Sequence, residues 1–301
     1  MKLFSKNSYE FSIFLFHGVI SNNPFDIRNY NNKHLNKDKF VKFLKYIKSV
    51  GNCISVEDLF YFKKKNFKIK KNTFLITFDD GFENNYSIAA PILDDLKMFS
   101  TFYFSTDFIE NNSMSWIDQI EHLVENTTLK KIILSIPKKI EFDISTKKKK
   151  IIFLDYLRYI VKKDLSFDVS KLILLLSEKL KVKNITSSNS PIDKKISWKN
   201  IKKMQSNNLF SIGGHSHEHF SLSSFKNDGF KYQINKSKSL FKKKMNHDLV
   251  HYSYPEGQKI DFNRKIIDYL KYKKIICCPT AQYGFNTLRT NLFKLKRISI
   301  T

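Results

Sequence analysis

The amino-acid sequence predicts an α/β fold whose central sheet is mainly parallel. Short apolar segments with the character of strands alternate along the chain with segments of helical spacing. Between residues 73 and 105 a strand, a helix and a second strand follow one another, which is the pattern of a βαβ unit. Such a sheet forms either a closed barrel or an open sheet. In both, functional residues gather at the carboxyl ends of the strands.

The first third of the chain is expected to hold three strands and two helices. Residues 37–50 carry apolar side chains at helical spacing, and Gly51 and Asn52 end that helix. Pro91 is expected to kink or break the second helix. The predicted elements are, in order, a strand at 11–16, a helix at 37–50, a strand at 73–78, a helix at 84–98 and a strand at 99–105.

The middle of the chain differs from its two ends. Residues 107–197 are rich in lysine and show helical patterns near 116–125 and 151–181. We therefore expect a helical insertion within a single domain that spans residues 1–301. After the insertion the alternation resumes, with helices expected at 198–206, 228–245 and 262–271 and strands at 209–212, 250–254 and 274–278.

The 301-residue chain is strongly basic, with a net charge of +25. Only five of its 53 basic residues are arginines, although arginine is the preferred residue for bidentate contacts to phosphate and guanine. Nucleic acid is therefore not an expected partner. We interpret the lysines as a solvated surface, and attraction through them to a membrane surface or an acidic glycan stays open.

Cysteine content and apolar runs bear on the compartment. The three cysteines, Cys53, Cys277 and Cys278, have no CxxC spacing and predict neither disulfides nor a zinc–thiolate site. No apolar run approaches the roughly 20 residues that span a bilayer. The apolar segment at 11–16 is shorter than a signal-peptide core of about 7–15 residues and has no cleavage site after it. We expect a cytoplasmic protein.

Two adjacent carboxylates end a predicted buried strand. Asp79 and Asp80 follow the apolar residues 74–76 (FLI), and Gly81 comes next. Burying an ionised carboxylate is costly unless a metal or a charged partner compensates it. A metal is one explanation, and it requires further ligands elsewhere in the chain.

Residues 213–219 (GGHSHEH) offer those ligands. His215 and His219 are four residues apart, and a helical turn or a loop folded like one brings both imidazoles to one face. His217 points away from that face. Two histidines and one carboxylate leave open positions for water and substrate, as in catalytic rather than structural metal sites.

Three segments resemble the polysaccharide deacetylase family (carbohydrate esterase family 4, the NodB-like homology domain). Residues 77–81 (TFDDG) match its first motif, residues 213–222 (GGHSHEHFSL) look like its second, and residues 252–257 (YSYPEG) are similar to its third. Residues 16–19 (FHGV) and 295–298 (LKRI) resemble further family segments, in the same order along the chain. The resemblance implies a distorted (β/α) barrel, TIM-like and with seven strands.

The resemblance also implies roles for individual residues. Asp79 is the general base, and Asp80, His215 and His219 hold a divalent metal, Zn²⁺ before Co²⁺, Ni²⁺ or Fe²⁺. Such a metal lowers the pKa of water toward about 7. The backbone N–H of Glu256 is the expected oxyanion donor. Candidate substrate contacts are Tyr254, Pro255 and Trp116, although a tryptophan at helical spacing is also a common core residue.

Three departures from the family pattern bear on activity. Ser253 replaces the arginine of the third motif, which contacts the catalytic aspartate in the family, and Arg297 is one candidate for the missing cation. Glu256 replaces the tyrosine of that motif and keeps only its N–H. The histidine that usually acts as general acid near the C-terminus is absent, so His17 is the preferred candidate; a core histidine bonded to backbone is the alternative.

The expected function is metal-dependent hydrolysis of an acyl group, N-acetyl by preference, from an amino sugar. The substrate would be an oligosaccharide or a nucleotide- or lipid-linked sugar of glycan synthesis. Two alternatives stay open: a deformylase or amidohydrolase acting on another amide, and a saccharide-binding protein that has lost its activity.

Overall fold

The fold is centred on a mainly parallel sheet. The computed structural model describes residues 2–136, 138–164 and 167–301. The sheet runs in the order β1, β5, β6 and β9, all parallel. The bounds of these strands are Glu10–Phe16, Thr73–Phe78, Ser100–Phe104 and Phe210–Gly214. The expected strands in these four regions are confirmed to within two residues at each end.

Short extended segments continue the sheet beyond β9 and lead back to β1. Gly214 pairs with Tyr252, and His251 pairs with Cys277, both in parallel. The N–H of Thr280 then donates to the carbonyl of Leu295. Finally β11 (Ile298–Ser299) lies parallel to β1. This path of pairings has seven members and returns to its start, as expected for a distorted barrel.

Two short strands lie beside this path, and two more form a separate pair. β4 (Asn52–Cys53) pairs with β5, and β10 (Asn286–Thr287) runs antiparallel to β1. β2 (Gly18–Ile20) and β3 (His34–Asn36) form a small parallel pair. This pairing places residues 18–20, just after β1, beside residues 34–36, which follow the loop that contains Lys33.

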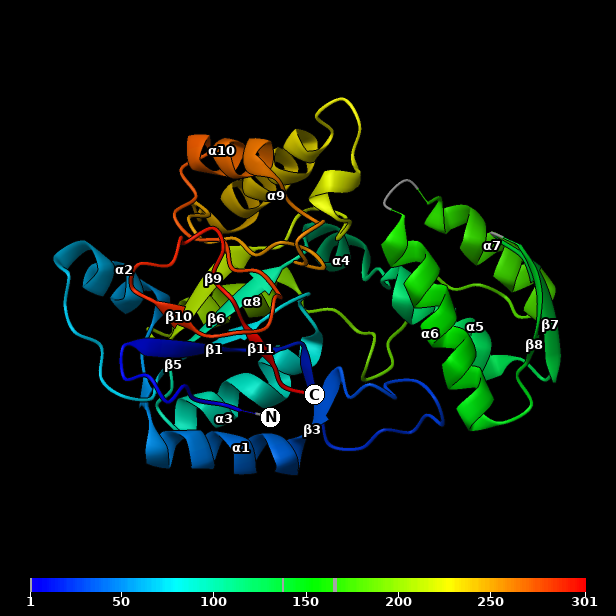
Figure 1. The fold of residues 1–301 in the computed structure, drawn as a ribbon, viewed down its shortest axis with the longest axis horizontal. Coiled ribbons are helices and arrows are strands. Elements are labelled where there is room, and N and C mark those ends of the chain that lie inside the picture. Colours follow the sequence, from blue (N-terminus) through cyan, green and yellow to red (C-terminus); the bar gives the residue numbers. More distant parts are fainter. Residues whose placement is uncertain (1, 137, 165–166) are drawn as a thin grey trace.

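Helices cover the outside of the sheet (Figure 1). The helices are α1 (Lys37–Val50), α2 (Val56–Lys65), α3 (Ala90–Asp95), α8 (Trp198–Gln205), α9 (Phe230–Met245) and α10 (Arg264–Tyr272). The buried faces of α1, α3, α8, α9 and α10, together with phenylalanines such as Phe16, Phe78 and Phe102, make the main apolar core, whereas α2 buries Val56 and Leu59 in a smaller cluster. The rings of Phe78 and Phe102 stack with centroids 4.8 Å apart.

The helix expected at 84–98 is split, as Pro91 suggested. A π-helical turn, Asn85–Ala89, precedes α3, and Pro91 lies in the first turn of α3. Proline has no N–H to donate to the preceding turn, so a regular α-helical hydrogen bond is missing there. The wider π-helical turn accommodates this break.

The segment between β6 and α8 packs largely around a second apolar cluster, to which Ile27 also belongs. It contains α4 (Thr106–Asn111), α5 (Trp116–Asn126), α6 (Lys147–Lys163) and α7 (Val169–Leu180). An antiparallel pair, β7 (Lys131–Ser135) and β8 (Lys139–Asp143), was not expected. The helical pattern at 151–181 corresponds to two helices. The assignment of one domain with an insertion stays a prediction.

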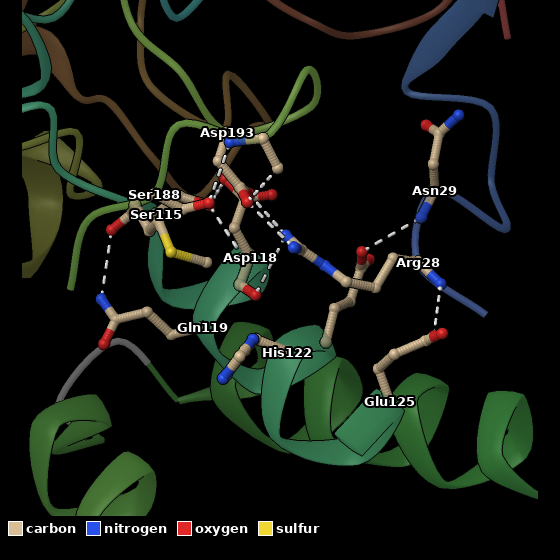
Figure 2. Close-up of polar contacts among 12 residues, drawn as sticks. Arg28, Asn29, Ser115, Asp118, Gln119, His122, Glu125, Ser188 and Asp193 are labelled. Carbon is tan, nitrogen blue, oxygen red and sulfur yellow. Dashed lines mark hydrogen bonds and ion pairs between the residues drawn. The ribbon is translucent and has the colours of Figure 1, made fainter. Parts of the chain in front are cut away.

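Buried polar contacts join α5 to two distant loops (Figure 2). The guanidinium of Arg28 donates to both oxygens of Asp193 and to the carbonyl of Asp118. Both side chains of the Arg28–Asp193 pair are at most 2% exposed. Removing one partner of such a pair typically costs about 3–5 kcal/mol. The pair therefore anchors the start of α5 to these two loops.

Two sequence expectations concern the chain as a whole. The three cysteines are free, as predicted. Among the helices of the described residues, none has both the length and the apolar character that crossing a membrane requires.

Candidate metal centre and active-site cavity

Three expected metal ligands converge beyond the ends of β5 and β9. Asp80 follows β5, and its φ of 75° lies in the left-handed region. His215 follows β9, where its N–H donates to the carbonyl of Phe104. The Oδ1 atom of Asp80 is 2.9 Å from His219 Nε2 and 3.6 Å from His215 Nε2. One ligand atom from each of the three residues lies within 4.8 Å of the others.

A loop rather than a helix brings the two histidines together. Ser216 and His219 both have positive φ, 63° and 61°, and the N–H of His219 donates to Ser216 Oγ. Local periodicity could not decide between the helix and the loop. The turn depends on these two backbone conformations.

The donor set fits a divalent metal. Two ligand atoms at about 2.0–2.2 Å from a tetrahedral ion are about 3.4 Å apart, and the two measured separations, 2.9 and 3.6 Å, bracket that value. Asp80 Oδ1 is also buried and has no hydrogen-bond partner within the described residues. Two imidazoles and a carboxylate are ordinary zinc ligands that leave a position open. Asp80, His215 and His219 therefore form a possible metal site.

Neighbouring groups fix the two imidazoles differently. His215 Nδ1 is 2.9 Å from the carbonyl of Ser253, so Nδ1 carries the proton and Nε2 is the free ligand atom. The ring of His219 stacks on Phe108 with centroids 5.2 Å apart. Its Nδ1 atom is buried and unpaired within the described part of the chain. Packing rather than a hydrogen bond therefore orients His219.

Charged neighbours shift the pKa values of Asp80 and His219. Burial acts to raise the pKa of Asp80, but the nearby histidines outweigh it and hold that pKa well below its usual range. Burial acts to lower the pKa of His219, but the Asp80 carboxylate outweighs it and raises that pKa. Asp80 is therefore ionised at neutral pH, as a metal ligand must be.

Asp79 faces an arginine from the far end of the chain. Arg297 Nη1 donates to Asp79 Oδ1 at 2.9 Å, and Nη2 donates to Oδ2 at 2.7 Å. The side chains of Arg297 and Asp79 are 0% and 4% exposed. Burial acts to raise the pKa of Asp79, but the guanidinium outweighs it and the pKa is lowered. Asp79 Oδ2 is also 3.8 Å from His215 Nε2, next to the possible metal site.

Ser253 lies within the same group of contacts. Its hydroxyl donates to Asp79 Oδ2 at 3.3 Å and accepts from Arg297 Nη2 at 3.0 Å. The motif arginine that Ser253 replaces is thus matched by Arg297, as one sequence interpretation suggested. A carboxylate has about four acceptor sites, and these contacts occupy three of them on Asp79.

A cavity of about 210 Å³ opens above these residues. Asp79, Asp80, His215 and His219 line it, and so does His17. Burial lowers the pKa of His17, although the two aspartates act to raise it. The His17 imidazole is therefore mostly neutral at pH 7.

The third-motif residues divide between the cavity and the core. Glu256 and Tyr254 line the cavity, whereas Pro255 is buried and does not line it. Glu256 has a φ of 59°, and its N–H donates no hydrogen bond within the described part of the chain. The side-chain carboxylate of Glu256 forms an ion pair with Lys162 Nζ of α6 at 2.7 Å. Tyr254 stacks on Phe262 with centroids 4.3 Å apart.

The segment that contains α5 and α6 supplies part of the cavity wall. Trp116, the first residue of α5, lines the cavity and is 9% exposed, so it is both a wall residue and a core residue. Lys33, which sequence analysis did not single out, also lines it. Lys33 Nζ is 2.9 Å from Asp118 Oδ1 and 3.8 Å from Asp80 Oδ2. One lysine among many carries no signal that could have identified it.

His217 lies apart from the possible metal site, as expected. Its Nδ1 atom is 2.8 Å from the hydroxyl of Thr106. It is absent from the group of residues whose ligand atoms converge among the described residues.

The described residues form an α/β fold with a carboxylate–histidine cluster beyond the strand ends, and comparisons with known proteins bear on the fold and on the family resemblance. The family model described as polysaccharide deacetylase matches residues 168–275. This match includes residues 213–222 and 252–257 and confirms the resemblance there, whereas residues 77–81 lie outside it. No curated protein matches the sequence.

Three solved structures share the fold at low sequence identity. A Streptococcus pyogenes deacetylase, PplD, in complex with acetate has a TM-score of 0.62 and 16% identity, over 98% of this chain and 93% of that one. IcaB from Ammonifex degensii has a TM-score of 0.62 and 13% identity, over 97% and 92%. The BpsB deacetylase domain from Bordetella bronchiseptica has a TM-score of 0.59 and 14% identity, over 98% and 97%. They confirm the predicted fold class.

Proposed function

We propose that this protein is a metal-dependent hydrolase that removes an N-acetyl group from an amino-sugar-containing saccharide. The main support is the position of the buried Asp79–Arg297 pair, 3.8 Å from one of three convergent metal-ligand candidates. The family match and the shared fold support deacetylation as the reaction. Asp80, His215 and His219 would hold the metal, zinc by preference, which supplies a Lewis acid and activates water at neutral pH.

Asp79 is proposed as the general base. Arg297 keeps it ionised at neutral pH and fixes the plane of its carboxylate. One of its roughly four acceptor sites stays free to take a proton. A base held in this way is ready without reorganisation, which is how preorganised groups lower a barrier.

His17 and Glu256 complete the proposed set. His17 is mostly neutral at rest, so it would take up a proton before giving one to the leaving amine. The N–H of Glu256 would donate to the developing oxyanion. Tyr254 and Trp116 would form walls around the sugar. Pro255 would act only through the backbone it shapes, because it does not line the cavity.

The proposed substrate is an acetylated amino sugar within an oligosaccharide or linked to a nucleotide or lipid carrier. Attraction of the lysine-rich surface to a membrane is part of this proposal, because many reactions on lipid-linked sugars take place there. The cytoplasmic location stays a prediction from the sequence.

Acetate release tests the proposal directly. Metal-stripped protein is reconstituted with zinc or cobalt and incubated with acetylated chitooligosaccharides and UDP-N-acetyl sugars, and acetate is measured. We expect release that depends on metal and disappears in Asp79→Asn. Acetate release that survives in Asp79→Asn would overturn the assignment of the base.

The same assay separates the two alternatives. Turnover of formylated or non-sugar amides in place of acetylated sugars would support a deformylase or amidohydrolase. Tight zinc binding without turnover of any acylated sugar or amide would support a saccharide-binding protein.

A further inference from the structure

Three cations line the catalytic cavity. Lys33 comes from the loop before β3, and Arg158 and Lys162 come from α6. None of the three belongs to the segments that resemble the deacetylase motifs. Lys33 Nζ is 3.8 Å from Asp80 Oδ2, so a group bound by Lys33 would lie next to the possible metal site.

The helices α5 and α6 bring the three cations together. Arg158 and Lys162 are four residues apart and therefore share one face of α6. Asp118 and Glu121 are three residues apart and share one face of α5. Lys33 Nζ is 2.9 Å from Asp118 Oδ1, and Arg158 Nη2 contacts Glu121 Oε1. Two neighbouring carboxylates thus hold two cations side by side before any ligand arrives.

In each of the three ion pairs the cation is more exposed than its carboxylate. The side-chain exposures of cation and carboxylate are 15% and 5% in the Lys33 pair, 18% and 6% in the Arg158 pair, and 48% and 16% in the Lys162 pair. An ammonium carries three N–H donors and a guanidinium five, so one carboxylate contact does not exhaust either group. The cations therefore keep donors that can face a ligand in the cavity.

The carboxylates that line the cavity do not cancel this positive group. Asp79 is neutralised by Arg297, and Asp80 is a metal-ligand candidate whose charge a divalent ion would offset. Glu256 is paired with Lys162. An anionic group that enters the metal-loaded cavity would therefore meet a positive potential, and the surrounding low-dielectric walls strengthen that attraction.

We propose that Lys33, Arg158 and Lys162 bind a phosphate group carried by the sugar that is deacetylated. This inference rests on the proposed function. A phosphate monoester has a charge of about −1.5 to −2 and three acceptor oxygens, so it can engage several cations where a carboxylate has only one charge to offer. Arg158 supplies a planar fork of donors, and the two lysines supply point charges.

The size of the cavity places the phosphate on the reacting sugar itself. The volume of about 210 Å³ is smaller than the range of about 300–1,000 Å³ typical of sites for larger organic ligands. Lys33 is also next to the possible metal site, where the amide would react. The substrate class is then an N-acetylated sugar phosphate, either free or esterified to a nucleotide or lipid carrier.

Paired substrates test this assignment. Zinc-loaded protein is incubated with the neutral methyl glycoside of N-acetylglucosamine, N-acetylglucosamine 1-phosphate, UDP-N-acetylglucosamine and polyprenyl-diphosphate-linked N-acetylglucosamine, and acetate is measured. We expect kcat/KM for the best phosphorylated substrate to exceed that for the methyl glycoside at least about tenfold. The phosphorylated substrate with the highest kcat/KM identifies the carrier.

Substitutions show whether the cations cause the preference. Arg158→Met should reduce this ratio to about twofold or less, and Lys162→Met, at a half-exposed position, should also lower it. Both substrates are measured on the same protein, so a partial loss of folding cancels from the ratio. Arg264→Met is the matched control, because Arg264 forms an exposed ion pair with Asp268 on α10, outside the cavity lining. This variant should keep the wild-type ratio.

Each outcome supports or overturns the phosphate site. Equal kcat/KM for neutral and phosphorylated sugars overturns it and leaves the deacetylase intact. A preference that is unchanged in both Arg158→Met and Lys162→Met overturns it as well. If no sugar releases acetate, the proposed function fails, and calorimetric binding of N-acetylglucosamine 1-phosphate decides. Loss of binding in Arg158→Met but not in Arg264→Met supports the site, and equal binding by both variants, or none by wild type, overturns it.

Discussion

Arg297 binds both carboxylate oxygens of Asp79 and also contacts the hydroxyl of Ser253, 44 residues earlier in the chain. The arginine therefore approaches Asp79 from the strand that closes the sheet, not from the segment that carries the third motif. The planar guanidinium supplies a fork of two N–H donors that lysine cannot reproduce. The cation that the resemblance places in the third motif is supplied here by residue 297.

Removing this arginine should abolish most activity. Arg297→Met leaves Asp79 buried without a cation, so we expect kcat/KM for an acetylated oligosaccharide to fall at least about 100-fold and the free energy of unfolding to fall by about 3–5 kcal/mol. Acetate release and chemical denaturation measure the two effects. Arg289→Met, an exposed arginine on the surface, is the matched control and should behave as wild type.

A double substitution distinguishes a loss of catalytic activity from a loss of folding. Ser253→Arg combined with Arg297→Ser returns the cation to the third motif and should recover part of the activity that Arg297→Met loses. Arg297→Lys keeps the positive charge but loses the two parallel N–H donors. Its kcat/KM should therefore lie between that of wild type and that of Arg297→Met. Full activity in a folded Arg297→Met protein would contradict the role given to the pair.

The pH profile should depend on the same residue. Asp79 accepts a proton only when ionised, and its pKa is lowered in the folded protein because Arg297 outweighs the effect of burial. In Arg297→Lys the weaker contact should let the pKa of Asp79 rise. The acidic limb of kcat/KM, measured between about pH 4 and 8, should then move to higher pH. Movement of the acidic limb to lower pH would contradict the expected rise in the pKa of Asp79.

Metal binding should depend on Asp80 and not on His217. Calorimetric titration of metal-stripped protein with zinc should show affinity weakened at least about 100-fold in Asp80→Asn or His219→Gln, since each removes a ligand outright. His217→Gln is the control, because its imidazole contacts Thr106 instead. Equal losses in all three variants would indicate a folding defect or a different site.

A glycine at position 256 should keep the enzyme active. Glu256 has a φ of 59°, a conformation that costs a non-glycine residue about 1–2 kcal/mol, and its proposed role needs only the backbone N–H. Glu256→Gly relieves this strain but loses the contact with Lys162. We expect kcat/KM within about threefold of wild type, measured by acetate release. A loss of two orders of magnitude would assign the role to the carboxylate instead.

Much of the fold could be predicted because its signals are local. The strand at 73–78 and the helix at 37–50 have the predicted bounds, since apolar spacing determines which face each element buries. The β7–β8 pair was missed within a segment dominated by lysine and helical spacing. Pro91 was expected to kink or break this helix, and the helix is split there. The π-helical form of the break was not predicted, because it depends on how the helix packs.

The sequence by itself determined that Asp80, His215 and His219 come together. All three follow strands of one parallel sheet, and parallel strands present their carboxyl ends at the same edge. Only the tertiary structure decided that Arg297 reaches Asp79, that Lys162 reaches Glu256 and that Lys33 lies beside Asp80. These partners are far apart in sequence and follow no periodic spacing, so closure of the sheet and the placement of the segment that contains α5 and α6 determine them.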